Sequence, residues 1–293
     1  LEGCPVLPLY VVEPDYWRQP FASKRHWHFI HDCLVELRHD CKRLGQSLVV
    51  KINDVPAALK QLADEFQINA IYAHEETGNG WTYNRDISVI KWCKSNEVDL
   101  NEYPCNGVVR RLRSRDDWSK IRNIRMAQDL ITRPEHLKPI ADIQEGHIPD
   151  KEDPMFGDYP IASPQKGGRR EGIKILKSFL TSRAQKYAQN ISAPGRSEDT
   201  CSRLSAHLTW GSISMKEVVH SLKLRRDGLP TEEKKYWKRN LSAFGSRLSW
   251  RCHFIQKLED QPEIEHMCMH PSFEGMRENE HNQDYYISWC EGK

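Results

Sequence analysis

The sequence predicts an α/β domain followed by an all-helical domain, and three observations support this prediction. Over residues 6–103, short apolar runs alternate with amphipathic helical patterns, as in a parallel sheet with helical crossovers. Six prolines then interrupt residues 134–164. After Gly168, apolar residues recur every three or four positions. We therefore expect a Rossmann-like parallel-sheet domain at 1–115, a linker at 116–166 and a helical domain at 167–293.

The first domain is predicted from short apolar runs and the helical patterns between them. Trp27 to Leu44 carries apolar residues at helical spacing, and Gly45 ends that helix. Asn53 or Asp54 begins the next helix. The spacing of a dinucleotide-binding fingerprint is absent, and we interpret Gly78-Asn79-Gly80 as a turn. The predicted strands are 6–12, 47–52, 69–73 and 98–103, and a further helix is predicted at 82–94.

The second domain is predicted from helical stripes and one capping pattern. A short helix at 118–129 interrupts the linker, and Ser214 with Glu217 forms a capping box before the next helix. A long helix runs from Thr231 to Leu258. Its apolar stripe contains Trp237, Leu241, Phe244, Leu248 and Ile255.

The most informative stretch is residues 200–214, which gathers hydroxyl groups around one arginine. Ser202 can cap a short helix that carries Leu204 and Leu208. Amide groups at a helix start, together with hydroxyls and Arg203, also make a cradle for phosphate. Both readings remain open, because many helices begin with Ser or Thr.

A second arginine points to the same chemistry. Arg251 falls on or beside the stripe of the long helix, and no acidic residue lies three or four positions away. A buried guanidinium needs a partner, so the partner comes from elsewhere in the fold or from an anionic ligand. Arg247, Trp250, Arg251 and Phe254 have the spacing of one helical face.

These motifs together resemble the photolyase/cryptochrome family. Ser202 to Ser205, Trp210 to Ser214 and the pair Trp250-Arg251 resemble its flavin-binding domain, whose start is similar to Gly167-Gly168-Arg169-Arg170-Glu171. Residues 7–13 and 23–30 resemble its antenna domain. The resemblance implies FAD as cofactor and a basic rim that binds DNA containing pyrimidine dimers. It also implies repair in which reduced FAD absorbs blue light and passes an electron to the dimer.

The resemblance also assigns residues. It implies FAD contacts from Tyr187, Cys201, Ser202, Arg203, Leu204, Ser205 and Arg251, with Cys201 where a hydroxyl is usual. Trp250 would stack on the extruded lesion; a tryptophan buried in the core is the alternative reading. No catalytic residue is identified in the chain as given.

One departure from the family leaves three functions open. Cyclobutane-dimer photolyases carry a glutamate where this chain has Arg247, which can only donate hydrogen bonds. Arg247 would instead meet a DNA phosphate or a different lesion. We expect a photolyase-like lyase; the alternatives are a cryptochrome-like photoreceptor without repair activity, or a non-catalytic remnant. Residues 75–85 do not match a folate antenna pair, so the antenna chromophore is unknown.

By the standard of that family the chain lacks its opening motif, and it stops at Trp289 to Lys293 where the family continues. We expect a fragment, a partial product or a divergent member. The missing half would complete the flavin pocket and supply the tryptophans that conduct electrons.

The distribution of charge and the cysteine content bear on the binding partner and the cellular compartment. The net charge is +2, but residues 216–251 hold ten Lys and Arg against four acids, whereas residues 259–293 hold nine acids against two bases. A basic middle suits DNA, although solvated helix faces give the same pattern.

Nine cysteines without a C-x-x-C pattern indicate an intracellular, reducing compartment: cytoplasm, nucleus or plastid. We expect a monomer without a membrane span. We also expect no metal, although His266, Cys268 and His270 alternate in a way that could suggest a metal site.

Overall fold

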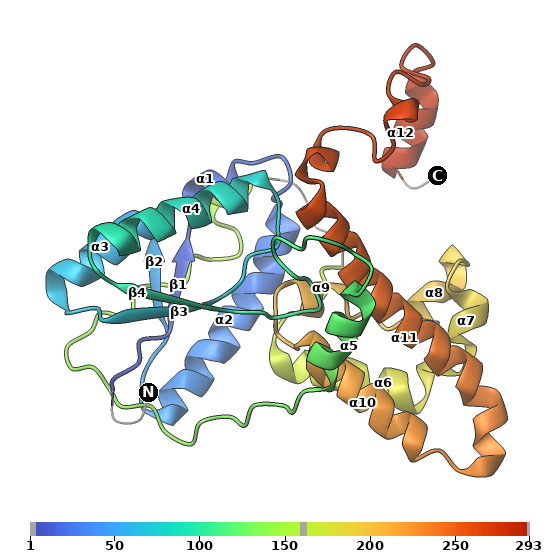
Figure 1. Ribbon diagram of the computed structural model, residues 1–293, viewed down its shortest axis with the longest axis horizontal. Helices are drawn as coiled ribbons and strands as arrows, with labels where there is room; N and C mark the ends of the chain where they lie inside the picture. The colour runs from blue at the N-terminus through green and yellow to red at the C-terminus, as the bar shows by residue number, and fades with distance from the viewer. Residues whose placement is uncertain (1–3, 159–162, 292–293) are drawn as a thin grey trace.

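The computed structural model describes residues 4–158 and 163–291. Residues 1–3, 159–162 and 292–293, which belong to the ends of the predicted domains and to the predicted linker, lie outside them. The chain forms an α/β part and a helical part joined by a long connection, and the C-terminal helix α12 (Gln283–Glu291) stands apart from both (Figure 1).

The α/β part contains two parallel pairs of strands. Strands β1 (Leu9–Val12) and β2 (Val49–Ile52) pair with each other, and β3 (Ala70–His74) pairs with β4 (Asp99–Tyr103). Among the described residues these are two separate two-stranded sheets, whereas the sequence analysis treated the four strands as one sheet. Parallel pairing is confirmed. Side chains rather than a backbone ladder connect the two pairs.

The helices of the α/β part begin and end where local chemistry requires. Ser23 caps α2 (Lys24–Leu44), and Gly45 ends it with a φ of 109°, in the left-handed region that favours glycine. Asp54 accepts a hydrogen bond of 2.8 Å from the amide of Ala57 and so begins α3 (Val55–Glu65). Asn79 does the same for α4 (Gly80–Ser95), so the predicted turn at 78–80 is also a helix cap. The remaining helix of this part is α1 (Pro14–Trp17).

The connection between the parts is mostly irregular, as its prolines predict. It contains α5 (Trp118–Ala127) and the short 3-10 helix η1 (Pro154–Phe156). Phe156 stacks on Trp27 of α2 with ring centroids 4.1 Å apart, and the Trp27 indole donates to the carbonyl of Asp150. These contacts fix the connection to the α/β part before it enters the helical part.

The helical part is built on α11 (Thr231–Asp260), which crosses the other helices (Figure 1). Trp237, Leu241, Phe244 and Leu248 of the predicted stripe are buried in one core with residues of α6 and α10. The predicted capping box is confirmed at the start of α10, where Ser214 and Glu217 bond to each other's backbone amides. The other helices are α6 (Arg169–Thr181), η2 (Arg183–Lys186), α7 (Tyr187–Asn190), α8 (Pro194–Thr200), α9 (Ser205–Thr209), α10 (Met215–Asp227), η3 (Pro262–Glu265) and η4 (Pro271–Phe273).

The two parts meet where α2 caps the start of α6. Asp32, Cys33 and Glu36 of α2 accept hydrogen bonds of 3.0–3.1 Å from the amides of Gly167, Gly168 and Arg170. This approach requires glycine, because a Cβ on Gly167 would lie 2.0 Å from the carbonyl oxygen of Phe29. His207 of α9 is fully buried beside this junction, packs against Phe29 and hydrogen-bonds Ser212 at 2.7 Å. The helical part is therefore held in a defined position against the α/β part.

Candidate functional site

The candidate site is a cavity of about 390 Å³ in the helical part. It lies where η2 and α7 face the turn before α9. Five of the seven residues predicted to bind a cofactor line it, although the sequence places Tyr187 well before the others. The lining residues are Gln165, Tyr187, Cys201, Ser202, Arg203 and Ser205, and none of them is acidic.

Tyr187 is fixed on its side of the cavity by aromatic packing and by α11. Its ring meets Phe179 and Phe244 edge to face, with centroids 5.4 and 5.9 Å away. The buried amide of Asn240 accepts from the Ala188 amide and donates to the Gln185 carbonyl, which holds α7 in place. Burial raises the pKa of Tyr187 to about 12, so its hydroxyl stays protonated at neutral pH.

The turn opposite Tyr187 has an unusual backbone. Arg203 has a φ of 60°, a left-handed conformation that is uncommon for a residue with a side chain. Gln165 holds this turn by donating to the Arg203 carbonyl at 2.7 Å. Leu204 faces inward and is 1% exposed, so it supports the turn from the core rather than lining the cavity. The Arg203 side chain is exposed, and no acidic side chain of the described residues pairs with it.

The prediction that Ser202 caps a helix is wrong. Helix α9 begins at Ser205 with Leu204 as its cap residue, and no side chain caps it. The Ser202 hydroxyl instead accepts a long hydrogen bond of 3.4 Å from the Leu204 amide, within the turn itself. The left-handed conformation of Arg203 moves the start of the helix beyond the reach of Ser202. The serine therefore belongs to the cavity wall.

Arg183, like Gln165, is a residue of the site that the sequence analysis missed. Its guanidinium donates to the carbonyls of Cys201 and Ser202, and also to the Ile175 carbonyl and the Ser178 hydroxyl. It thereby joins α6 to the 201–203 turn. Burial, and secondly the charge of Arg203, lower the pKa of Arg183. The sequence did contain a signal for this role: as with Arg251, no acid lies three or four residues from Arg183, so its partner had to come from elsewhere in the fold.

The remaining predicted residues lie on α11, outside the cavity wall. Arg251 is half-buried and donates to the carbonyl of Leu208 at 3.1 Å, so a backbone group of α9 is the partner that the sequence required. Trp250 is half-exposed, and its interpretation as a core residue is wrong. The Arg247 guanidinium lies 4.4 Å from the Trp250 ring centroid, and Phe254 packs against the same ring.

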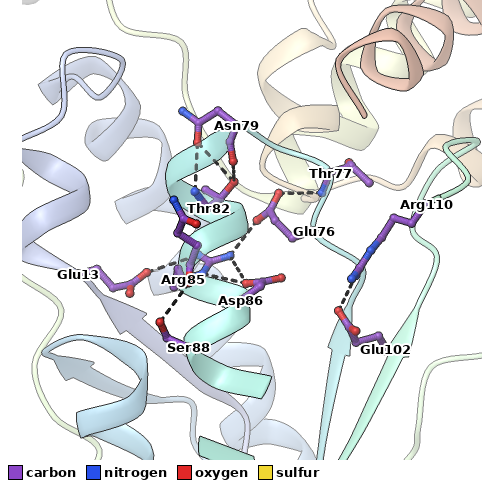
Figure 2. A network of polar contacts seen from close by, with 11 residues as sticks. Glu13, Glu76, Thr77, Asn79, Thr82, Arg85, Asp86, Ser88, Glu102 and Arg110 are labelled. Carbon is purple, nitrogen blue, oxygen red and sulfur yellow. Dashed lines mark hydrogen bonds and ion pairs between the residues drawn. The ribbon is translucent and has the colours of Figure 1, made fainter. Parts of the chain in front are cut away.

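A second polar cluster lies at the carboxyl ends of the strands, where open α/β sheets place ligands (Figure 2). We call Glu13, Glu76, Arg85 and Asp86 the strand-end cluster. Arg85 on α4 contacts Glu13 after β1 at 3.4 Å, and Glu76 after β3 and Asp86 at 2.9 Å each. These ion pairs connect the two strand pairs. They also surround the one arginine with carboxylates, so the cluster has no cation left for an anionic ligand.

Burial dominates the electrostatics of this cluster. It raises the pKa of Glu13 and of Asp86 despite the nearby Arg85, because one guanidinium is shared among three carboxylates. Burial alone would lower the pKa of Arg85, but Asp86, Glu13 and Glu76 offset this and raise it. The cluster is an internal ion-pair network that joins Glu13 to Glu76, Arg85 and Asp86. It includes two residues of the segment 75–85, which does not match a folate antenna.

Residues 2–117 match the family model described as DNA photolyase. Over 251 residues the chain is 24% identical to a blue-light photoreceptor, PHR2, of Arabidopsis thaliana, covering 74% of this chain and 55% of the relative. Over 274 residues it is 23% identical to a deoxyribodipyrimidine photo-lyase of Streptomyces griseus, covering 88% and 56%. The chain thus spans little more than half the length of these relatives.

Solved structures extend the likeness to the whole described fold. A class III photolyase from Agrobacterium tumefaciens aligns with a TM-score of 0.76 at 17% identity, covering 99% of this chain and 60% of that one. An archaeal photolyase from Sulfolobus tokodaii, solved with two FAD molecules, aligns with a TM-score of 0.71 at 21% identity, covering 100% and 62%. The resemblance predicted from the sequence is confirmed. Residues 2–117 match that family's model, and the described chain has the fold of photolyases and cryptochromes.

Proposed function

We propose that this chain binds FAD through the cavity in its helical part and belongs to a photolyase-like lyase that repairs ultraviolet-damaged DNA under blue light. One observation carries the proposal: the cavity brings Tyr187 together with the 201–205 turn and its one cation, Arg203, without an acidic lining residue. Such a surface attracts phosphate. The family match and the FAD-bound archaeal structural relative support the choice of FAD among phosphate-bearing ligands.

The residues in and behind the cavity wall would have different roles toward a bound dinucleotide. Arg203 and the hydroxyls of Ser202 and Ser205 would hold the phosphates at the cavity wall. Arg183 would keep the turn in place from behind, since its donors are already used by backbone carbonyls. Arg251 would act through the end of α9, whose Leu208 carbonyl it binds. When bound, FAD would supply light absorption and electron transfer.

The exposed face of α11 is the proposed contact for damaged DNA. Trp250 offers a half-exposed aromatic surface for an extruded base, and Arg247 offers a cation for a neighbouring phosphate. We take repair as the first function because this aromatic surface lies within a basic segment of the sequence.

A photoreceptor function is the alternative, and the contact between Arg247 and Trp250 favours it. The guanidinium lies 4.4 Å from the ring centroid, on a surface that a stacked base would need. A protein in which Arg247 stays on the ring would bind FAD without repairing dimers. A non-catalytic remnant would bind no flavin at all.

The first experiment is an absorption spectrum of the purified chain, with any released cofactor identified by mass and with a titration of FAD. The proposal expects a flavin spectrum, released FAD, and weaker binding in Arg203→Ala and Arg251→Ala. Arg226→Ala is the matched control, because Arg226 also donates to a helix carbonyl, that of Leu241, but does not line the cavity. A folded wild-type chain that takes up no FAD would contradict the proposal for this chain.

A second experiment separates repair from signalling. An oligonucleotide with one defined cyclobutane dimer is incubated with FAD-loaded, reduced protein under blue light and in the dark. Light-dependent loss of the dimer supports the lyase, and an intact dimer with a normal flavin spectrum supports the photoreceptor.

We also propose that the protein is a monomer and that it works in an intracellular, reducing compartment. The nine free cysteines favour such a compartment. No helix among the described residues is long and apolar enough to cross a membrane.

A further inference from the structure

The first half of α11 carries a concentrated basic surface that the proposed flavin site does not use. Four cationic side chains and Ser242 line a hollow of about 530 Å³. We call Lys234, Lys235, Lys238 and Arg239 the α11 basic patch. All four residues are exposed, and none of the hollow's lining residues is acidic.

The charges of the patch are available for a ligand. Among the described residues, none of the four pairs with a carboxylate; Lys235 only lies over the ring of Tyr236, at 4.7 Å. The nearby Glu233 is engaged with Arg225 at 3.4 Å. A fifth cation extends the patch from the neighbouring helix, because Arg226 of α10 lies 3.4 Å from the Ser242 hydroxyl. Like charges held so close repel one another, which favours a polyanion that compensates them.

Helix geometry places Arg239 of this patch in line with the proposed lesion contact, and the three lysines follow around the side of the helix. Arg239, Ser246 and Trp250 are spaced by seven and four residues, so they lie on one side of α11, and all three are exposed. Eleven positions separate Arg239 from Trp250, which is about 17 Å along the helix axis. A duplex rises 3.4 Å per base pair, so this separation corresponds to about five base pairs.

We propose that the α11 basic patch binds the phosphate backbone of DNA and forms a second contact about five base pairs from Trp250. The inference rests on the proposed function in taking DNA as the polyanion. It adds a sequence-independent contact outside the flavin cavity. Its role would be to hold the duplex along α11 while the base at Trp250 is engaged.

The test measures binding of an undamaged 20-base-pair duplex by fluorescence anisotropy, in the dark and without flavin, from 50 to 200 mM salt. The patch variant changes Lys234, Lys235, Lys238 and Arg239 to Gln. The control variant changes Arg43, Lys60, Lys91 and Lys94 to Gln, which removes the same charge from exposed positions of the α/β part. Both sets are exposed, so melting temperatures should match that of the wild type.

We expect the patch variant to bind at least roughly tenfold more weakly at the lower salt concentration, and its slope of log affinity against log salt to flatten by about 0.9 for each lost phosphate contact. The control should keep the wild-type slope. Equal slopes in wild type and patch variant, no binding of duplex by the wild type, or patch-dependent binding to anionic vesicles but not to duplex would each overturn the inference. The FAD titration is independent of these readouts, so failure of the flavin proposal is recognised separately.

Discussion

The strand-end cluster and the helical-domain cavity use arginine in opposite ways. In the cluster, Arg85 is shared by three carboxylates, so the charge of this arginine is compensated inside the protein. In the cavity, Arg203 extends from a strained turn and has no acidic partner within residues 4–158 and 163–291, while Arg183 fixes that turn through backbone carbonyls. The difference separates two roles: a compensated arginine stabilises the fold, whereas an uncompensated one at a cavity is available to a ligand.

The largest expected effect is loss of the strand-end cluster. Arg85→Met leaves Glu13, Glu76 and Asp86 facing one another, and we expect the free energy of unfolding at pH 7.5 to fall by about 3 kcal/mol. Arg110→Met is the matched control, because Arg110 has similar exposure but a single partner, Glu102 (Figure 2). It should cost about 1 kcal/mol. Urea unfolding of both variants measures the difference.

The same variant makes a pH prediction. The pKa values of Glu13 and Asp86 are already raised by burial, and removal of Arg85 raises them further. A carboxyl whose folded pKa is raised binds protons more readily when folded, so stability increases as pH falls toward the unfolded value. The deficit of Arg85→Met should therefore shrink between pH 7.5 and pH 5. A deficit that stays constant would mean that Arg85 acts through packing rather than charge.

The second effect concerns ligand binding. Arg183→Met frees the carbonyls of Cys201 and Ser202 and should weaken FAD binding by about 2 kcal/mol, roughly thirtyfold. Riboflavin, which lacks phosphate, should bind Arg183→Met and wild type alike. Arg225→Met is the control, because Arg225 also donates to a carbonyl and lies over an aromatic ring, away from the cavity. Equal losses for FAD and riboflavin would show general loosening instead of a displaced phosphate cradle.

The third effect is a pH dependence at the junction between the parts. Burial lowers the pKa of His207 from its ordinary 6.5. The unfolded chain then binds a proton more readily than the folded one, so this stability is complete above about pH 6.5 and is lost as pH falls. The loss is at most about 1.4 kcal/mol per pH unit for one proton. His207→Asn should reduce the fall in melting temperature between pH 7.5 and 5.5. Part of the fall should remain in this variant, because burial also lowers the pKa values of His26 and His31.

The sequence predicted most of the fold because its signals are local. Gly45, Asp54 and the Ser214–Glu217 pair each act within one helix turn, and each was found where expected. The 201–205 side of the cavity also follows from a local pattern, whereas Tyr187 was assigned through the family resemblance and Gln165 was not predicted. By contrast, Arg183 acts across 18 or more residues, and the carboxylates around Arg85 come from three separate segments. Such pairings depend on how the elements pack, which periodicity does not encode.

The smallest effect separates two serines that the sequence made look alike. Ser214 is a true cap, so Ser214→Ala should lower the free energy of unfolding by about 1 kcal/mol. Ser202 caps no helix, and Ser202→Ala should change it by less than about 0.5 kcal/mol. FAD affinity should show the reverse order, with Ser202→Ala weakening binding and Ser214→Ala leaving it unchanged. If Ser202→Ala costs as much stability as Ser214→Ala, the 201–205 turn is a structural cap after all, and its assignment to the ligand site loses its main support.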